Sequence, residues 1–176
     1  MRPMKQILPV WFFVAAAVIG CAAEGTTATN TVQSTMYDDT AAGMVMHHRF
    51  RTAASPERIW AAIATADGLA RWAAKEAKVE LRPGGAYELY FRPENAPGKR
   101  GMEGNKVLSF APHRVLSYSG GLPDTWVLYS IEPEPAGGAI VNFIAMGTHP
   151  DWKAKCAAQA PAVTAFVQKL ADHLRP

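Results

Sequence analysis

Apolar and polar residues alternate along several short stretches of the chain, which is the spacing of strands with one buried face. Seven stretches carry this pattern or are bounded by turn residues in the same way, and they span 44–51, 78–81, 86–91, 102–110, 114–119, 126–132 and 140–146. Turn-forming residues separate neighbouring stretches, for example at 82–85 and 133–138. The pattern therefore predicts strands joined by hairpins, and hence a twisted antiparallel sheet.

A helix is predicted directly after the first of these strands. Ser55 can cap its amino terminus, and Pro56 suits its first position because proline lacks the N–H that would be unsatisfied there. Its apolar residues Ile59, Trp60 and Ile63 recur at helical spacing.

Two more helices are expected. A short one should cover 69–74, after the break at Asp67 and Gly68. The longest should cover 151–174, where a single apolar stripe recurs at steps of three and four residues. Pro161 lies inside it and predicts a kink or a fresh helix start. This amphipathic helix is the natural cover for one face of the sheet.

The first part of the chain has a different character. Residues 1–20 hold two basic residues and then an apolar run from 7 to 19, shorter than the roughly 20 residues that span a bilayer. These are marks of a secretory signal peptide. The sequence at 18–21 resembles the lipobox of bacterial lipoproteins, which implies cleavage before Cys21 and lipidation of that cysteine. An ordinary signal peptide with a chance cysteine and an uncleaved membrane helix are the alternatives.

This resemblance implies an exported protein that is attached to the cell envelope through Cys21. Ala22 follows the cysteine in place of the Asp that would favour retention at the inner membrane, so we expect the outer membrane, facing the periplasm. Residues 21–43 are polar and lack apolar periodicity, and we interpret them as a flexible tether. The expected domain then covers 44–176.

Composition excludes several classes of function. The net charge of +3 includes Arg2 and Lys5, which leave with the signal peptide, so the mature chain is nearly neutral. No run of basic residues points to nucleic acid or to an anionic surface. Once Cys21 is lipidated, Cys156 has no cysteine to pair with, and we expect it to pack on a helix.

Several segments together resemble the helix-grip domains of the START-like superfamily (SRPBCC), in the branch named after the activator of the heat-shock-protein-90 ATPase. They span 54–60, 69–72, 81–85, 104–108, 112–118, 127–133 and 139–148. The resemblance implies an α+β fold in which an antiparallel sheet of about six or seven strands wraps around a long C-terminal helix. Ala73 departs from the family pattern, which often has a second tryptophan after Trp72, and so does Pro161.

The resemblance also implies a hydrophobic cavity between the concave face of the sheet and the last helix. Its expected ligand-binding residues are apolar side chains of the strands and two aromatic ones near the entrances: Trp72, Tyr87, Leu89, Phe91, Tyr129, Phe143 and Phe166, with Ile131 and Val141 as further candidates. The alternative is that these residues are plain core, because burial alone favours each of them by roughly 1.5–3 kcal/mol.

We expect no catalytic residue, metal site or cofactor. His47 and His48 are neighbours on a strand, so they point to opposite faces and cannot share a metal ion; we expect both at the surface or at an edge. The preferred function is non-enzymatic binding of a small hydrophobic molecule, such as a lipid or an isoprenoid-like compound. The first alternative is an enzyme of the cyclase or hydrolase kind using His149 or Glu103, and the second is a protein-interaction or chaperone co-factor module.

Overall fold

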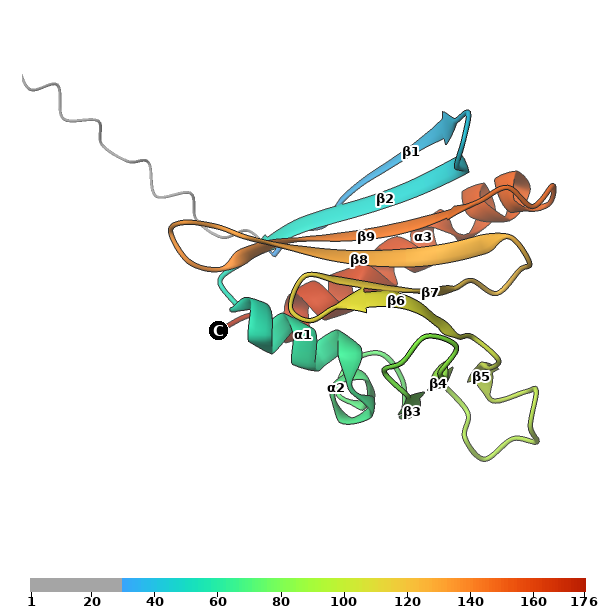
Figure 1. The fold of residues 1–176 in the computed structure, drawn as a ribbon, viewed down its shortest axis with the longest axis horizontal. Helices are drawn as coiled ribbons and strands as arrows, with labels where there is room; N and C mark the ends of the chain where they lie inside the picture. Colours follow the sequence, from blue (N-terminus) through green and yellow to red (C-terminus); the bar gives the residue numbers. More distant parts are fainter. Residues whose placement is uncertain (1–29) are drawn as a thin grey trace, which may run out of the picture.

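The computed structural model describes residues 30–176, which form an α+β fold of two antiparallel sheets and three helices (Figure 1). In chain order the elements are β1 (Gln33–Asp39), β2 (Gly43–Thr52), α1 (Pro56–Ala64), α2 (Ala66–Ala70), β3 (Glu76–Val79), β4 (Tyr87–Tyr90), β5 (Gly101–Met102), β6 (Val107–Ala111), β7 (Val115–Ser119), β8 (Thr125–Pro133), β9 (Ala139–Gly147) and α3 (Trp152–His173). No helix within 30–176 is long and apolar enough to cross a bilayer.

The larger sheet has six strands in the order β1-β2-β9-β8-β7-β6, and α3 lies across one of its faces (Figure 1). The smaller sheet has the order β3-β4-β5. The two are joined beside β6, where the Tyr87 N–H donates to the Asn105 carbonyl at 2.9 Å and the Val107 N–H donates to that of Gly85 at 2.8 Å. The predicted antiparallel sheet with a long C-terminal helix is therefore confirmed.

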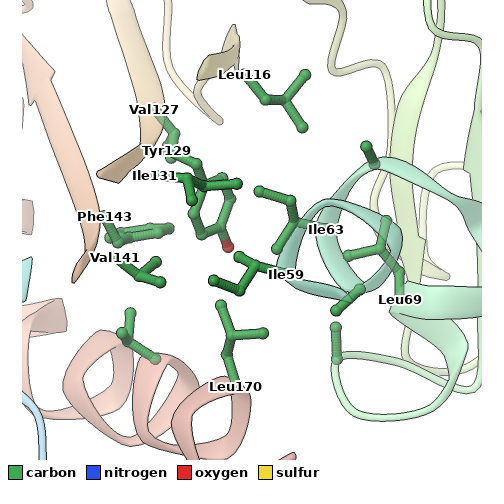
Figure 2. Packing of buried hydrophobic residues seen from close by; sticks show 14 of the residues in the cluster. Ile59, Ile63, Leu69, Leu116, Val127, Tyr129, Ile131, Val141, Phe143 and Leu170 are labelled. Atoms are coloured by element: carbon green, nitrogen blue, oxygen red, sulfur yellow. The ribbon is translucent and has the colours of Figure 1, made fainter. Parts of the chain in front are cut away.

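Alternating residues of β8 and β9 form the centre of the core. Val127, Tyr129 and Ile131 are buried on one face of β8, and each lies directly opposite a buried residue of β9 on the same face. Figure 2 shows this layer meeting Ile59 and Ile63 of α1 and Leu170 of α3. The alternation expected for β8 is confirmed, whereas in β9 residues 139–143 are buried on both faces.

The helix caps explain where α1 and α2 begin. The Ser55 hydroxyl accepts a hydrogen bond from the Arg58 N–H at 3.3 Å, as expected of a cap. For α2 the expected start was wrong, because Thr65 acts as its cap and accepts from the Gly68 N–H at 3.0 Å. The helix therefore covers 66–70 rather than 69–74.

Two other expectations were also wrong. The strand expected over 102–110 is divided between the two sheets: β5 pairs with β4, whereas β6 pairs with β7. Gly104, with φ of +81°, turns the chain between them. Residues 33–39, expected within the flexible tether, form the edge strand β1 against β2. The predicted signal peptide, Cys21 and the part of the predicted tether up to residue 29 lie outside the described residues.

Residues 30–32 are also held against the domain. The Gln168 side-chain amide donates to the Asn30 carbonyl at 2.7 Å, and its oxygen accepts from the Val32 N–H at 3.1 Å. Residues on the amino-terminal side of the expected boundary at 44 therefore belong to the domain, and 30–32 lie beside α3.

The position of His48 differs from the one expected at the surface or at an edge. His48 is fully buried, because it shares the inward face of β2 with Met46 and Phe50 and its ring lies 5.9 Å from that of Phe143. Within residues 30–176 neither ring nitrogen has a hydrogen-bond partner. Burial, with a smaller contribution from the charge of His47, lowers the pKa of His48 to about 4.

The helix α3 continues through Pro161 without a fresh start. We expect Pro161→Ala to raise the free energy of unfolding by about 1–3 kcal/mol, because alanine restores an N–H to the helix and relieves the clash of the ring with the preceding turn. Urea unfolding would measure this. Pro97→Ala, in an exposed loop, is the matched control and should give little change. An unchanged stability of the Pro161 variant would contradict the expectation.

We also expect His48 to make the fold acid-sensitive. Its folded-state pKa of about 4 lies below the ordinary 6.5, so below pH 6.5 the unfolded chain binds a proton that the folded chain does not. Stability should fall between pH 6.5 and 4, by up to about 3 kcal/mol from this group. In the His48→Leu variant, the free energy of unfolding measured with urea should no longer show this decrease between pH 6.5 and 4. His113→Asn, at an exposed turn position, should retain it.

Candidate ligand cavity

A cavity of about 420 Å³ lies between the larger sheet and the amino-terminal part of α3. Its walls come from β7, β8, β9, α3, the turn before β8, and the segment around β4 and β5. The lining residues are Phe91, Met102, Tyr118, Gly120, Gly121, Thr125, Trp126, Val127, Phe143, Ala145, Trp152, Gln159, Ala162, Val163 and Phe166. None of these side chains is charged, and most are apolar, as in pockets for small apolar molecules.

The distribution of large and small residues explains why the space is open here. Phe143 and Ala145 are successive inward positions of β9, opposite Tyr129 and Val127 of β8. At the Tyr129–Phe143 pair the two rings meet edge to face at 5.1 Å and fill the space. One step further along, Val127 and Ala145 are smaller, and Ala162 of α3 borders the same space. The cavity is therefore a region where the chain provides too little side-chain volume to close the gap.

Hydrogen bonds at both ends hold α3 over the sheet. The Trp152 indole N–H donates to the Met44 carbonyl at 2.7 Å, beside the cavity. At the other end of the helix, the Thr52 hydroxyl donates to the Leu174 carbonyl at 3.3 Å. Both partners lie on β2, so one strand sets the position of α3 along its length.

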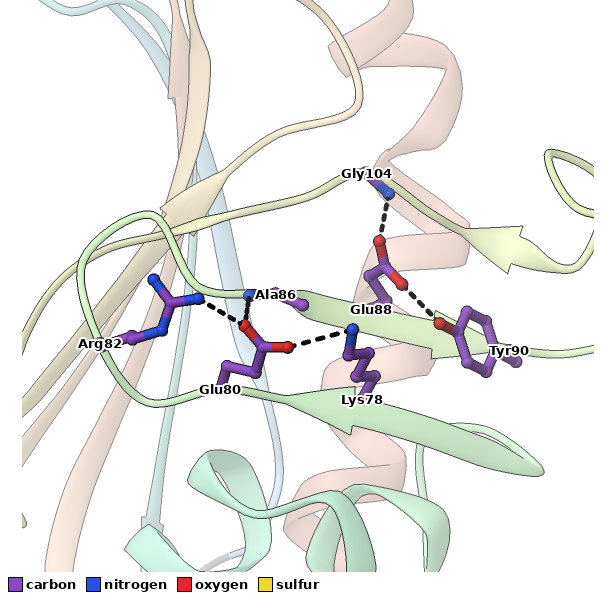
Figure 3. A network of polar contacts seen from close by, with 7 residues as sticks. All are labelled: Lys78, Glu80, Arg82, Ala86, Glu88, Tyr90 and Gly104. Atoms are coloured by element: carbon purple, nitrogen blue, oxygen red, sulfur yellow. Dashed lines mark hydrogen bonds and ion pairs between the residues drawn. The ribbon is translucent and has the colours of Figure 1, made fainter.

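A network in the small sheet fixes the wall formed by Met102 (Figure 3). The Glu88 carboxylate accepts hydrogen bonds from the Tyr90 hydroxyl and, at 2.8 Å, from the Gly104 N–H. These contacts, that with Tyr90 foremost, lower the pKa of Glu88 and keep it ionised. Because Gly104 is two residues beyond Met102, the network holds the end of β5 against the cavity.

Comparison with known proteins identifies the family. The family described as "Activator of Hsp90 ATPase homolog 1-like protein" (AHSA1) matches residues 53–173. The chain belongs to this family. The resemblance inferred from its sequence segments is thus confirmed. Comparison with curated protein sequences finds no match.

Solved structures share the AHSA1-like fold. The solution structure of the Aha1 dimer from Colwellia psychrerythraea is 24% identical, with a TM-score of 0.58 over 74% of this chain and 96% of that one. A crystal structure from Rhodobacter sphaeroides is 22% identical, with a TM-score of 0.60 over 81% and 95%. A conserved protein of unknown function from Enterococcus faecalis is 14% identical, with a TM-score of 0.61 over 81% and 77%. These identities establish a common fold alone.

Three of the seven predicted ligand-binding residues line the cavity in this AHSA1-like domain: Phe91, Phe143 and Phe166. Trp72 is next to it, because its ring lies 4.9 Å from that of Phe166 while its indole N–H donates to the Ala62 carbonyl. Tyr87, Leu89 and Tyr129 do not line it and are almost fully buried in the core, as are Ile131 and Val141.

The helix α1 explains why those strand residues are core. Ile59 and Ile63 of α1 fill the part of the concave face where Tyr129 and Ile131 point (Figure 2). The Tyr87 hydroxyl donates to the Ile63 carbonyl at 2.8 Å, and its ring stacks on that of Tyr118 at 4.2 Å. Strand alternation identified the correct face of the sheet, but it does not show how far α1 extends over that face.

Sequence reasoning missed most of the helical side of the cavity. Gln159, Ala162, Val163 and Phe166 recur at steps of three and four residues on α3, so they share one face of the helix. Only Phe166 was named, although Val163 belonged to the apolar stripe. The periodic spacing could therefore have identified part of this wall. No such spacing identifies Trp126 and Trp152, which lie near the beginning of a strand and of a helix.

The polar groups of the cavity are neutral. Burial raises the pKa of Tyr118, so its phenol stays protonated at physiological pH. The acid–base candidates His149 and Glu103 do not line the cavity. Glu103 instead binds Arg100, with 2.7 Å between Nη2 and Oε1, and hydrogen bonding from the Arg100 N–H foremost lowers its pKa. The cavity thus offers shape and apolar surface. Its polar side chains are Tyr118, Thr125, Trp126, Trp152 and Gln159, of which Thr125 and Trp152 already donate to backbone carbonyls.

Proposed function

We propose that this AHSA1-like protein binds a small hydrophobic molecule in the cavity beneath α3, without transforming it, while attached to the cell envelope through a lipid on Cys21. The observation that carries the proposal is the cavity itself. Its volume of about 420 Å³ falls within the range of small-molecule pockets, and its aromatic, uncharged walls suit an apolar ligand.

The composition of the walls favours binding over the enzymatic alternative. General acid–base catalysis needs a titratable group within hydrogen-bond reach of the reacting atoms. The lining residues include no Asp, Glu, His, Lys or Arg, and the one phenol, Tyr118, is kept neutral by burial. A cavity of this kind can exclude water and orient a ligand through the amide of Gln159, which is what a carrier requires.

The anchor would place this carrier close to a source of hydrophobic molecules. Eight residues separate Cys21 from Asn30, and a fully extended chain reaches about 3.5 Å per residue, so the domain would stay within about 30 Å of the bilayer. A second acyl chain strengthens membrane attachment greatly, because a single chain holds only marginally.

Filling the cavity should abolish binding. We expect Ala162→Trp to weaken binding of the neutral fluorescent probe N-phenyl-1-naphthylamine by about tenfold or more, since the indole takes up space that the ligand needs. The assay is fluorescence titration of the purified full chain. Ala165→Trp is the matched control, because Ala165 is exposed on the same helix, as Ala162 is, but does not line the cavity.

If the wild-type protein and the Ala162 variant bind the probe equally, the proposed site is wrong. The carrier function itself fails if two results coincide: the wild-type protein does not bind the probe, and native mass spectrometry of the wild-type protein finds no copurifying ligand.

The anchor is tested separately. We expect Cys21→Ser to abolish the incorporation of radiolabelled palmitate into the protein, because serine cannot form the thioether to the lipid. Metabolic labelling with immunoprecipitation measures this, and Cys156→Ser is the matched control, which should keep the label. A Cys21 variant that still carries the label would contradict lipidation at this residue.

A further inference from the structure

A second recess adjoins the cavity and has the opposite character. It is about 410 Å³ in volume and is lined by residues 70–75, Phe91 and Lys169. Arg71, Lys75 and Lys169 provide three cationic side chains, and no acidic residue lines it. We call it the basic recess. The sequence contains no run of basic residues that would predict this recess, because its charged residues come from the end of α2, the following turn and α3.

The cations of the basic recess have little compensation from the rest of the domain. Lys75 lies 3.7 Å from Glu94, but both side chains are more than 60% exposed, so this pair is weak. Within residues 30–176, no carboxylate lies within ion-pair distance of Arg71 or Lys169. These two groups, from different elements, are available to an external anion.

Aromatic side chains form the boundary between the basic recess and the cavity. Phe91 lines both spaces, and it is 42% exposed, which is high for a phenylalanine. Trp72 of the basic recess lies against Phe166 of the cavity, with 4.9 Å between ring centroids. A molecule that passes beside Phe91 can therefore contact the apolar walls at one end and the cations at the other.

We propose that the ligand is an anionic amphiphile, with its apolar part in the cavity and its carboxylate or phosphate group at Arg71, Lys75 and Lys169. This inference rests on the proposed function, because it specifies the ligand class of the same cavity. The uncharged cavity takes only the apolar part. The anionic group finds charge-assisted hydrogen bonds in the basic recess, where the guanidinium of Arg71 can bind two oxygens at once.

A matched pair of ligands tests the inference. Decanoic acid and 1-decanol have the same alkyl chain, and the acid is ionised at about pH 7.5. Each is titrated against the mature chain, residues 21–176 with Cys21→Ser, purified without detergent, by displacement of N-phenyl-1-naphthylamine. We expect the acid to bind about tenfold more tightly than the alcohol, and raising NaCl from about 50 to about 500 mM should reduce only the affinity for the acid.

The triple variant Arg71→Gln, Lys75→Gln, Lys169→Gln should lose the preference for the acid and keep the affinity for the alcohol. Arg114→Gln, which removes an exposed positive charge lining neither space, is the control and should keep the preference. If wild-type protein binds acid and alcohol equally, or salt affects both alike, the inference is overturned while the carrier function stands. If neither ligand displaces the probe and the probe itself does not bind, the proposed function fails instead.

Discussion

The position of α3 over the sheet is the constraint on which the other features depend. Hydrogen bonds from Trp152 to the Met44 carbonyl and from Thr52 to the Leu174 carbonyl tie both ends of the helix to β2. With the helix fixed, side-chain volume decides what lies beneath it. Where Tyr129 and Phe143 meet Leu170 and the residues of α1, the layer is solid; where Ala145 and Ala162 border it, a cavity remains. The same placement of α3 therefore gives a solid core at one end of the helix and a cavity at the other, depending on the size of the side chains beneath it.

Features whose cause is local or periodic could be predicted from the sequence. The alternation in β8, the Ser55 cap and the stripe of α3 each follow from burial or hydrogen bonding within a few residues. The strand β1 could not be predicted in this way, because every one of its side chains is exposed and its pairing with β2 uses the backbone. The position of His48 was missed for a different reason: its place on the inward face of β2, beside Met46 and Phe50, follows from the alternation of that strand, but a histidine was not expected in the core.

The candidate site was predictable in part for a related reason. Period-two spacing identifies the inward face of a strand, so Phe143 was found, but Tyr129 on the same face is covered by α1. Which inward residues face a cavity depends on contacts between elements far apart in sequence. The basic recess is the extreme case, since Lys169 joins Arg71 and Lys75 only once α3 has packed.

The point where the chain enters the domain connects these features. Asn30 and Val32 are bound by Gln168 of α3, and the next residue, Lys169, lines the basic recess. A lipid on Cys21, nine residues before Asn30, would hold this turn of α3 near the bilayer. Anionic amphiphiles that leave a membrane would then meet the cations first and the apolar cavity second. Long-range attraction favours this order, because charge acts over about 10 Å in salt solution whereas apolar burial requires contact.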